Sequence, residues 1–153
     1  MPQFNLGEEM ADMGTDAPEW GPMLEAAWRS REGAHAPYSG FRVGAAVLLS
    51  DGSIFPGCNI ENAAYPLCIC AERAALCAAV SIAGARPGQV KALAVVTEAN
   101  ELTPPCGACR QAFAEFGTDL PILLANKAQR KLFSLGFLLP EAFTSQNLAP
   151  NVP

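Results

Sequence analysis

The chain has 153 residues, enough for one domain with its own hydrophobic core. Half of its residues are hydrophobic and only 16% are charged, against roughly 25% in average proteins, so we expect part of the apolar surface to lie at a subunit interface. The net charge is −5 and no basic run is longer than Arg130-Lys131, which excludes a nucleic-acid partner because such partners are bound through basic patches.

The N-terminal segment and the six cysteines bear on the cellular compartment. The first residues, MPQFNLGEEMADMG, are acidic and lack an apolar core, so we expect no secretory signal peptide. The longest apolar helical stretch, over 74–85, is too short to cross a bilayer, so no membrane partner is expected. We therefore expect a reduced, cytoplasmic protein whose thiols bind metal or pack. Residues 1–20 are interpreted as an acidic tail, 21–148 as a single domain and 149–153 as a C-terminal tail.

The first predicted elements are a helix and a hairpin. Pro22 favours the first turn of a helix that runs to about Arg31. An apolar run over 43–49 has strand character, and the turn signal that follows it predicts a returning strand over 54–60. Small residues at 44–46 indicate that another element packs closely on the first strand.

The second half alternates between helices and strands. The expected elements are a helix over 70–83 ended by Gly84, a strand over 90–97, a helix over 107–116 ended by Gly117, a strand over 120–125 and an apolar segment over 133–143 broken by Gly136 and Pro140. A helix between successive strands favours parallel pairing, whereas the hairpin favours antiparallel pairing. The pattern therefore predicts an α/β fold in which helices cover both faces of a mixed sheet.

Three cysteines form the most informative motif. Cys70 stands in Cys-Ala-Glu-Arg, and Cys106 and Cys109 stand in Pro-Cys-Gly-Ala-Cys-Arg. Structural zinc sites almost always have four protein ligands, whereas catalytic sites have three and hold water in the fourth position. The three thiols therefore indicate one Zn2+ that activates a water molecule.

The neighbours of these cysteines suggest how the site works. Both segments are expected to open helices, whose free N–H groups and partial positive charge favour thiolates. Three thiolates leave a formal charge of −1 with Zn2+ and make a bound water a weaker acid. Arg73 and Arg110 are close to the ligands in sequence, so we expect at least one of them to donate hydrogen bonds to a thiolate. Glu72 can accept the proton of the water and deliver it to a substrate nitrogen.

Other interpretations of these residues remain open at this point. A CxxC pair is also typical of a redox pair or of half a structural zinc site. Cys68 can supply a fourth thiolate and close the site. Cys58 and Cys77 are expected to be small buried residues, and His35, the only histidine, is not expected to be a ligand. Glu72 alone also fits an acid that stabilises a helix N-terminus.

Several motifs together resemble the cytidine deaminase family, in its small homotetrameric branch. The zinc deaminase signature, with three cysteines and a glutamate that is not a ligand, is one of them. The resemblance spans about 22–148 and implies a three-layer α-β-α arrangement with a mixed five-stranded sheet, one zinc per subunit, and a homotetramer whose subunits share their sites. The matching segments are PYS and FRVGA over 37–45, GCNIENA over 57–63, YP at 65–66, CAER over 70–73, PCGACRQ over 105–111 and LLPEAF over 138–143.

The resemblance also implies how a nucleoside binds. Asn59 and Glu61 would hold the ribose hydroxyls, and alternate residues of a strand do point the same way. The carboxylate of Glu61 would repel a 5′-phosphate, which favours a nucleoside over a nucleotide. The bland alternative is a turn-capping Asn59 and a solvated Glu61.

The base would be held by aromatic and backbone groups. By resemblance, Phe41 stacks on the pyrimidine, Phe143 closes the site, and backbone groups near the ligand cysteines, including Ala71, hold the base. Residues matching Tyr65 and Phe143 are presented to a neighbouring subunit's site. Pro104 departs from the family, in which a small or hydroxylated residue is usual, and it has no N–H to donate.

We therefore predict hydrolytic deamination of cytidine and deoxycytidine, by zinc-bound hydroxide and a Glu72 proton shuttle, to uridine and deoxyuridine in pyrimidine salvage. A blasticidin-S-type antibiotic deaminase is the nearest rival, but it lacks the ribose segment over 59–62. A polynucleotide deaminase would need basic grooves. A non-catalytic, zinc-stabilised assembly module is the alternative from a different class.

Overall fold

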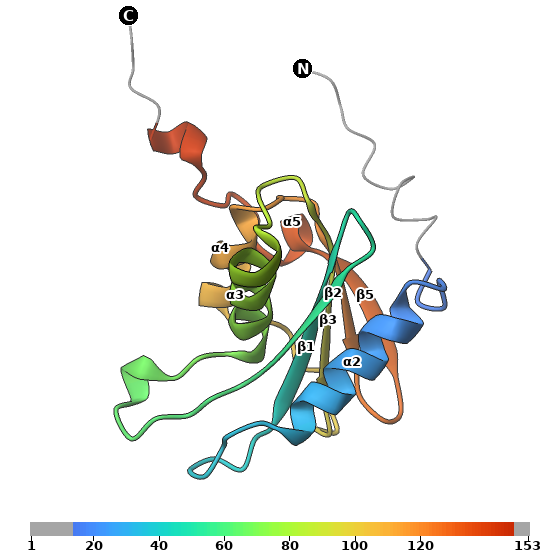
Figure 1. The fold of residues 1–153 in the computed structure, drawn as a ribbon, viewed down its shortest axis with the longest axis vertical. Coiled ribbons are helices and arrows are strands. Elements are labelled where there is room, and N and C mark those ends of the chain that lie inside the picture. Colours follow the sequence, from blue (N-terminus) through green and yellow to red (C-terminus); the bar gives the residue numbers. More distant parts are fainter. Residues whose placement is uncertain (1–13, 149–153) are drawn as a thin grey trace, which may run out of the picture.

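The computed structural model describes residues 14–148, so 1–13 and 149–153 of the two predicted tails lie outside the described residues. The predicted domain boundaries stay predictions. A five-stranded sheet in the order β2-β1-β3-β4-β5 forms the middle layer (Figure 1). Its strands are β1 (Val43–Leu49), β2 (Ile54–Cys58), β3 (Val90–Thr97), β4 (Pro121–Ala125) and β5 (Arg130–Ser134).

Helices cover both faces of the sheet. In Figure 1, α2 (Trp20–Glu32) lies on one side, and α3 (Ala71–Ala83) and α4 (Gly107–Ala114) lie on the other. The short α5 (Leu135–Leu138) packs on the same side as α3 and α4, since Leu135 belongs to their core cluster. Two 3₁₀ turns, η1 (Tyr65–Leu67) and η2 (Ser145–Leu148), lie in the connections. The predicted three-layer α/β fold is confirmed.

The strand pairing follows the predicted connections. β1 pairs antiparallel with β2, its hairpin partner, and also with β3. β3 and β4, which are joined through α4, pair parallel, as a crossover helix requires. The sheet is therefore mixed, with its parallel pair in the second half of the chain.

The position of the fifth strand was not found from the sequence. β5 pairs antiparallel with β4 over Arg130–Ser134 and overlaps only the first two residues of the predicted apolar segment over 133–143. It begins with the exposed Arg130 and Lys131. An edge strand is commonly protected by charges of this kind, and the same charges hide it from a search for apolar runs.

The core has two halves because both faces of the sheet are covered. On β1, Val47 and Leu49 face the cluster with α3 and α4, whereas Ala46 faces α2. β3 alternates in the same way, with Leu93 toward α3 and α4 and Ala94 toward α2. Strands buried on both faces give nearly continuous apolar runs, as the sequence shows.

Two glycines allow helices to approach the sheet closely. A Cβ on Gly44 would overlap the carbonyl oxygen of Ala27 on α2, which confirms the close packing predicted for this strand. A Cβ on Gly57 would lie 2.5 Å from the carbonyl oxygen of Ala71 on α3. α3 therefore rests directly on the β2 backbone, and α3 follows directly after Cys70.

Three local predictions were wrong. α4 ends at Ala114, whereas the predicted helix ended at residue 116. β2 ends at Cys58, whereas the predicted strand ended at residue 60. Beyond it, Ile60 forms isolated bridges with His35 and Ile69, because the chain leaves the sheet there. Cys77, predicted to be buried, is exposed on α3, and Cys58 is partly buried.

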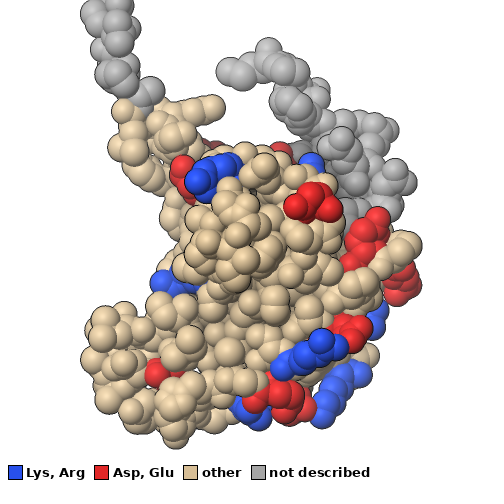
Figure 2. All heavy atoms as spheres, viewed as in Figure 1, with Lys and Arg blue, Asp and Glu red and all other residues tan. Residues whose placement is uncertain are grey.

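The outer surface is unevenly charged. In Figure 2, charged side chains are densest over α2, whereas the opposite part of this face, over α3 and the loop before it, has few. Within residues 14–148, no helix is long and apolar enough to span a membrane.

Candidate zinc and active site

Three thiols converge where two helices begin. Cys70 is the N-cap of α3 and Cys106 is the N-cap of α4, both with extended backbones. The Sγ atoms of Cys70 and Cys106 are 3.7 Å apart, and those of Cys106 and Cys109 are 3.5 Å apart. All three sulfurs lie within 4.8 Å of one another. The sheet thus brings together ligands that are far apart in the sequence.

The geometry of this cluster fits a zinc ion. With Zn–S bonds of about 2.3 Å in a tetrahedron, ligand sulfurs lie about 3.8 Å apart. The observed separations are close to this value, and thiolates are ligands that zinc prefers. Cys109 is buried, Cys70 is partly buried and Cys106 is exposed, so the cluster can hold one ion at the surface end of the two helices.

The thiols are already polarised by their surroundings. A hydrogen bond from the Cys109 thiol, together with Arg73, lowers the pKa of Cys70 to about 5 despite partial burial. The pKa of Cys109 is raised, because its thiol donates to Cys70 and is buried. Arg73 Nη2 is 3.8 Å from the Cys70 sulfur. These surroundings therefore favour the thiolate form of Cys70, which is the form that binds zinc.

Glu72 is the second residue of α3, and its side chain lies beside these thiols. It is only 5% exposed, one of few buried charged groups among the described residues. Burial raises its pKa to about 7, and the charge of Cys70 acts in the same direction. A carboxyl group with such a pKa can both accept and donate a proton near neutrality.

Arg110 contacts different groups from Arg73. Its Nε donates to the carbonyl oxygen of Pro105 at 2.8 Å, and its Nη1 donates to that of Leu138 at 2.7 Å. These bonds fix the residue before Cys106 and join it to the end of α5. Arg110 therefore holds the ligand loop, while Arg73 contacts a ligand sulfur.

Glu61 faces a loop rather than open solvent. Its carboxylate accepts hydrogen bonds from the Ser39 hydroxyl and from the N–H groups of Tyr38, at 2.8 Å, and Ser39, at 3.3 Å. These bonds, the Ser39 hydroxyl first, lower the pKa of Glu61. A hollow of about 280 Å³ lies here, lined by Tyr38, Ser39, Glu61, Tyr65 and Cys68.

Asn59 holds the backbone around Phe41. Its Nδ2 donates to the carbonyl oxygen of Phe41, and its Oδ1 accepts from the N–H of Val43, both at 2.8 Å. The Phe41 ring is 43% exposed and so is available to a ligand. The ribose contact of Asn59 stays a prediction. The structure shows its side chain bonding backbone groups, as in the turn-capping alternative, but the partners lie in a distant segment of the chain.

The remaining predicted residues lie in different surroundings. Tyr65 is 68% exposed, and its ring stands edge-on to that of Tyr38 at 6.0 Å between centroids. Phe143 is 56% exposed, and its carbonyl oxygen accepts a hydrogen bond from Gln111 on α4. Ala71 is buried at the first position of α3, where a helix N–H has no acceptor within the helix. Pro104 is exposed.

Ser39 is the site residue that sequence reasoning missed. It stands in the Pro-Tyr-Ser motif, and nothing in the sequence pattern assigns it a role in the site. Its hydroxyl donates to Glu61 and accepts from the Phe41 N–H at 3.0 Å, so it links a carboxylate to the aromatic residue. A serine in a turn segment such as Pro-Tyr-Ser-Gly can accept a hydrogen bond from the backbone N–H two residues later, and this is the signal that points to Ser39.

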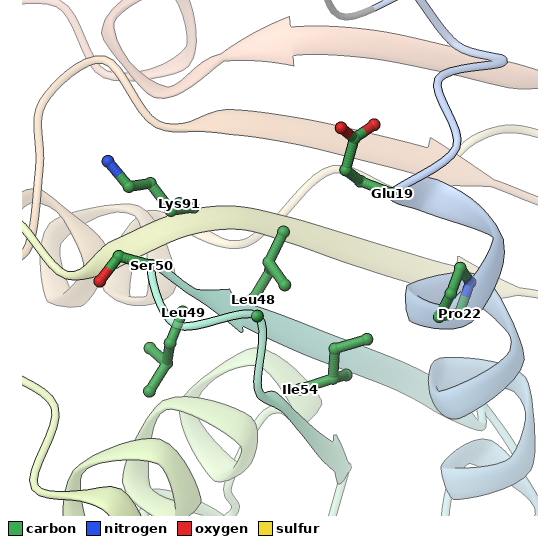
Figure 3. A pocket seen from close by; sticks show the side chains of 8 residues that line it. Glu19, Pro22, Leu48, Leu49, Ser50, Ile54 and Lys91 are labelled. Carbon is green, nitrogen blue, oxygen red and sulfur yellow. The ribbon is translucent and has the colours of Figure 1, made fainter.

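Another cavity lies away from the predicted site residues. It has a volume of about 460 Å³ and lies between the start of α2, the β1–β2 turn and β3 (Figure 3). Leu48 and Ile54 give it an apolar floor, and Glu19 and Lys91 stand at its margin. It includes none of the residues predicted from the motifs.

The fold and the thiol cluster define a zinc-binding α/β class of protein. Residues 22–124 match the family model described as the cytidine and deoxycytidylate deaminase zinc-binding region. The chain therefore belongs to this family, and the resemblance seen in its sequence is confirmed.

Relatives and solved structures agree with this assignment. A cytidine deaminase from Halalkalibacterium halodurans is 46% identical over 128 residues, covering 82% of this chain and 95% of the relative. One from Sporosarcina psychrophila is 48% identical over 129 residues, covering 83% and 93%. The crystal structure of cytidine deaminase from Burkholderia pseudomallei has 51% identity and a TM-score of 0.76, covering 80% of this chain and 97% of that one.

Proposed function

We propose that this protein hydrolyses cytidine and deoxycytidine to uridine and deoxyuridine with release of ammonia. One observation carries the proposal. Three cysteine sulfurs lie at the spacing of zinc ligands where α3 and α4 begin, and the buried carboxyl group of Glu72 lies beside them. The relatives named above, which are cytidine deaminases, support the substrate class.

The residues of the site have distinct roles in this reaction. Cys70, Cys106 and Cys109 would hold a zinc ion, which supplies a water of lowered pKa as the nucleophile for C4 of the ring. Glu72 would take one proton from the attacking water and deliver it to N3; it would then take the proton of the hydroxyl group on C4 and deliver it to the amino group, which leaves as ammonia while C4 keeps a carbonyl oxygen. Arg73, close to the Cys70 sulfur, offsets the negative charge of the thiolates.

The nucleoside is held beside the thiols by the loop over 38–43 and its supports. The exposed Phe41 ring stacks on the pyrimidine, and Glu61 accepts hydrogen bonds from ribose hydroxyls through the lone pairs that the loop leaves free. A carboxylate here repels a 5′-phosphate, so nucleosides are preferred over nucleotides. Ala71 contributes backbone contacts to the base.

We further propose a homotetramer in which Tyr65 and Phe143 complete a neighbour's site. Most of the large apolar side chains that are exposed lie in two groups, and their exposure supports a covered interface. The sparsely charged face over α3 supports it as well (Figure 2). The two groups are Tyr38, Ile60, Tyr65, Leu67 and Ile69 before α3, and Phe137, Phe143 and Leu148 after β5. A monomeric mass by light scattering would contradict this assembly.

A cytoplasmic location stays a prediction.

The direct test is incubation with cytidine, deoxycytidine and their monophosphates. The ultraviolet change to uracil products is followed, with protein-bound zinc measured in parallel. Turnover of the nucleosides, with the monophosphates much slower, is the expected result. Bound zinc without turnover of any of the four compounds would refute the enzyme and favour the zinc-stabilised assembly module.

A further inference from the structure

Arg31 is a buried cation that the proposed mechanism does not use. It lies in the last turn of α2, and its side chain is only 8% exposed. Its Nε donates to the carbonyl oxygen of Arg42 at 3.2 Å, and its Nη2 donates to Glu98 Oε2 at 2.8 Å. A buried guanidinium is costly unless it is paired and hydrogen-bonded, so these partners account for its position.

The carbonyl group of Arg42 belongs to the segment that presents Phe41. Asn59 bonds the carbonyl oxygen of Phe41 and the N–H of Val43 from the β2 side. Arg31 bonds the carbonyl group between them from the α2 side. The two peptide groups on either side of the Phe41 Cα are held by the Ser39 hydroxyl and by Asn59, and Arg31 holds the next peptide group along the chain. Since the backbone at Phe41 sets where its ring points, these bonds form a clamp on the ring, and Arg31 acts on it through the adjacent Arg42.

We propose that Arg31 is a positioning residue for the pyrimidine: by holding the carbonyl group of Arg42, it keeps the Phe41 ring in the orientation that stacks on the base. The inference rests on the proposed function, because the contact of Phe41 with the substrate is part of that function. Arg31 itself touches no reacting atom.

A competing route runs through Glu98 rather than Phe41. Glu98 follows β3 and starts the loop that leads to Cys106, and Lys127 also holds it, at 2.5 Å. If Arg31 acted through this loop, its loss would disturb the thiols and hence zinc content. The Phe41 route predicts instead a weaker base contact around an intact metal site.

The first experiment compares Arg31→Met with Arg29→Met in the full chain. Arg29 lies on the same helix, is 78% exposed in its side chain and pairs only with Glu25 among the described residues. We expect Arg31→Met to raise KM for cytidine up to about tenfold, because a misplaced Phe41 ring loses part of its stacking on the base, and stacking of one base contributes a factor of this order to affinity. Its kcat and zinc content should stay near the wild-type values, and Arg29→Met should change none of the three.

The second experiment is a double-mutant cycle with Phe41→Leu. If Arg31 acts through the ring, Arg31→Met should add less than about twofold to KM when the ring is already gone. Full additivity would overturn the proposal. Glu98→Gln should leave KM nearly unchanged, and an equal rise of KM with lost zinc would assign the effect to the ligand loop.

If Arg31→Met does not fold, Arg31→Lys tests the same proposal with the same measurements. Arg31→Lys keeps the charge and most of the packing but lacks the planar fork, and it should raise KM to an intermediate value with an unchanged Tm. A wild-type KM in Arg31→Lys and additivity in the cycle would both contradict the clamp. Wild-type protein without turnover would refute the proposed function and this inference together. An active wild type with an Arg31→Met variant like Arg29→Met would refute the inference alone.

Discussion

Adding one methyl group at Gly57 should impair catalysis although Gly57 touches no substrate in the proposed mechanism. A Cβ at this position would be 2.5 Å from the carbonyl oxygen of Ala71 and 2.9 Å from the carbonyl carbon of Ala74. Both atoms belong to the α3 backbone, which cannot give way as a flexible side chain does. α3 must therefore move by about 1 Å away from β2 to restore ordinary contact in a close-packed interior.

This movement separates two halves of the site. α3 carries Glu72 and follows Cys70, whereas Cys106 is the N-cap of α4 and Cys109 is its third residue. A misplacement of about 1 Å can lower turnover about 100-fold, and we expect a loss of that size in kcat together with weaker zinc binding. Overpacking of this kind costs about 1–3 kcal/mol, which in a chain of this length lowers Tm by about 2–12 °C.

The assay measures cytidine turnover per folded molecule, zinc content and Tm for Gly57→Ala. Gly21→Ala is the matched control, because its added methyl group meets no atom within 4 Å. It should keep turnover and zinc, with a Tm equal to or slightly above that of the wild type. If Gly57→Ala kept wild-type turnover and zinc, the packing of α3 on β2 would not fix the thiol geometry, and the reasoning would be wrong.

Three further predictions address individual groups. Glu72→Gln should keep the fold and zinc but lower kcat at least about 100-fold, because one positioned proton carrier contributes about 10²–10⁴; normal turnover would remove Glu72 from the mechanism. Cys109→Ser should lose zinc or hold it weakly by metal analysis, and unchanged metal content would point to other ligands. The lowered pKa of Glu61 keeps its carboxylate ionised as pH falls from 7 to 5, so KM for cytidine should not rise there on account of Glu61. Ser39→Ala removes the largest cause of that lowering, so the acid rise of KM should begin at higher pH than in the wild type, and coinciding profiles would contradict the assigned cause.

The sheet and its helices could be predicted because their signals are local. Gly84, for example, ends α3 in the left-handed conformation, with φ of 66°, as its position in the sequence suggests. The strands β1 and β3 are apolar on both faces and stand out from the turns around them. β5 could not be found in this way, because an edge strand buries little and carries charge.

The contacts around Glu61 and Phe41 depend on a different kind of information. Strand alternation was used to place Asn59 and Glu61 on one side, but β2 ends at Cys58, before either residue. Both residues meet the loop over 38–43 instead, through bonds that join distant parts of the sequence. Such loop-to-loop contacts have no period, so a sequence pattern can name the residues without giving their partners.

Position within a helix, rather than closeness in sequence, decides which of Arg73 and Arg110 contacts a ligand sulfur. Cys70 and Cys106 are N-caps, and the side chain three residues after each of them lies on the same face of the first helical turn. Arg73 is the third residue of α3 and lies 3.8 Å from the Cys70 sulfur.

In α4 the third position belongs to Cys109, whose sulfur is 3.5 Å from that of Cys106. Arg110 comes one residue later, about 100° further around the helix, and so turns to Pro105 and Leu138. The same offset that places a second ligand under one N-cap thus places a cation under the other. This difference gathers three sulfurs and one guanidinium in a single cluster, in which the sulfurs would hold the ion and the guanidinium contacts one of them.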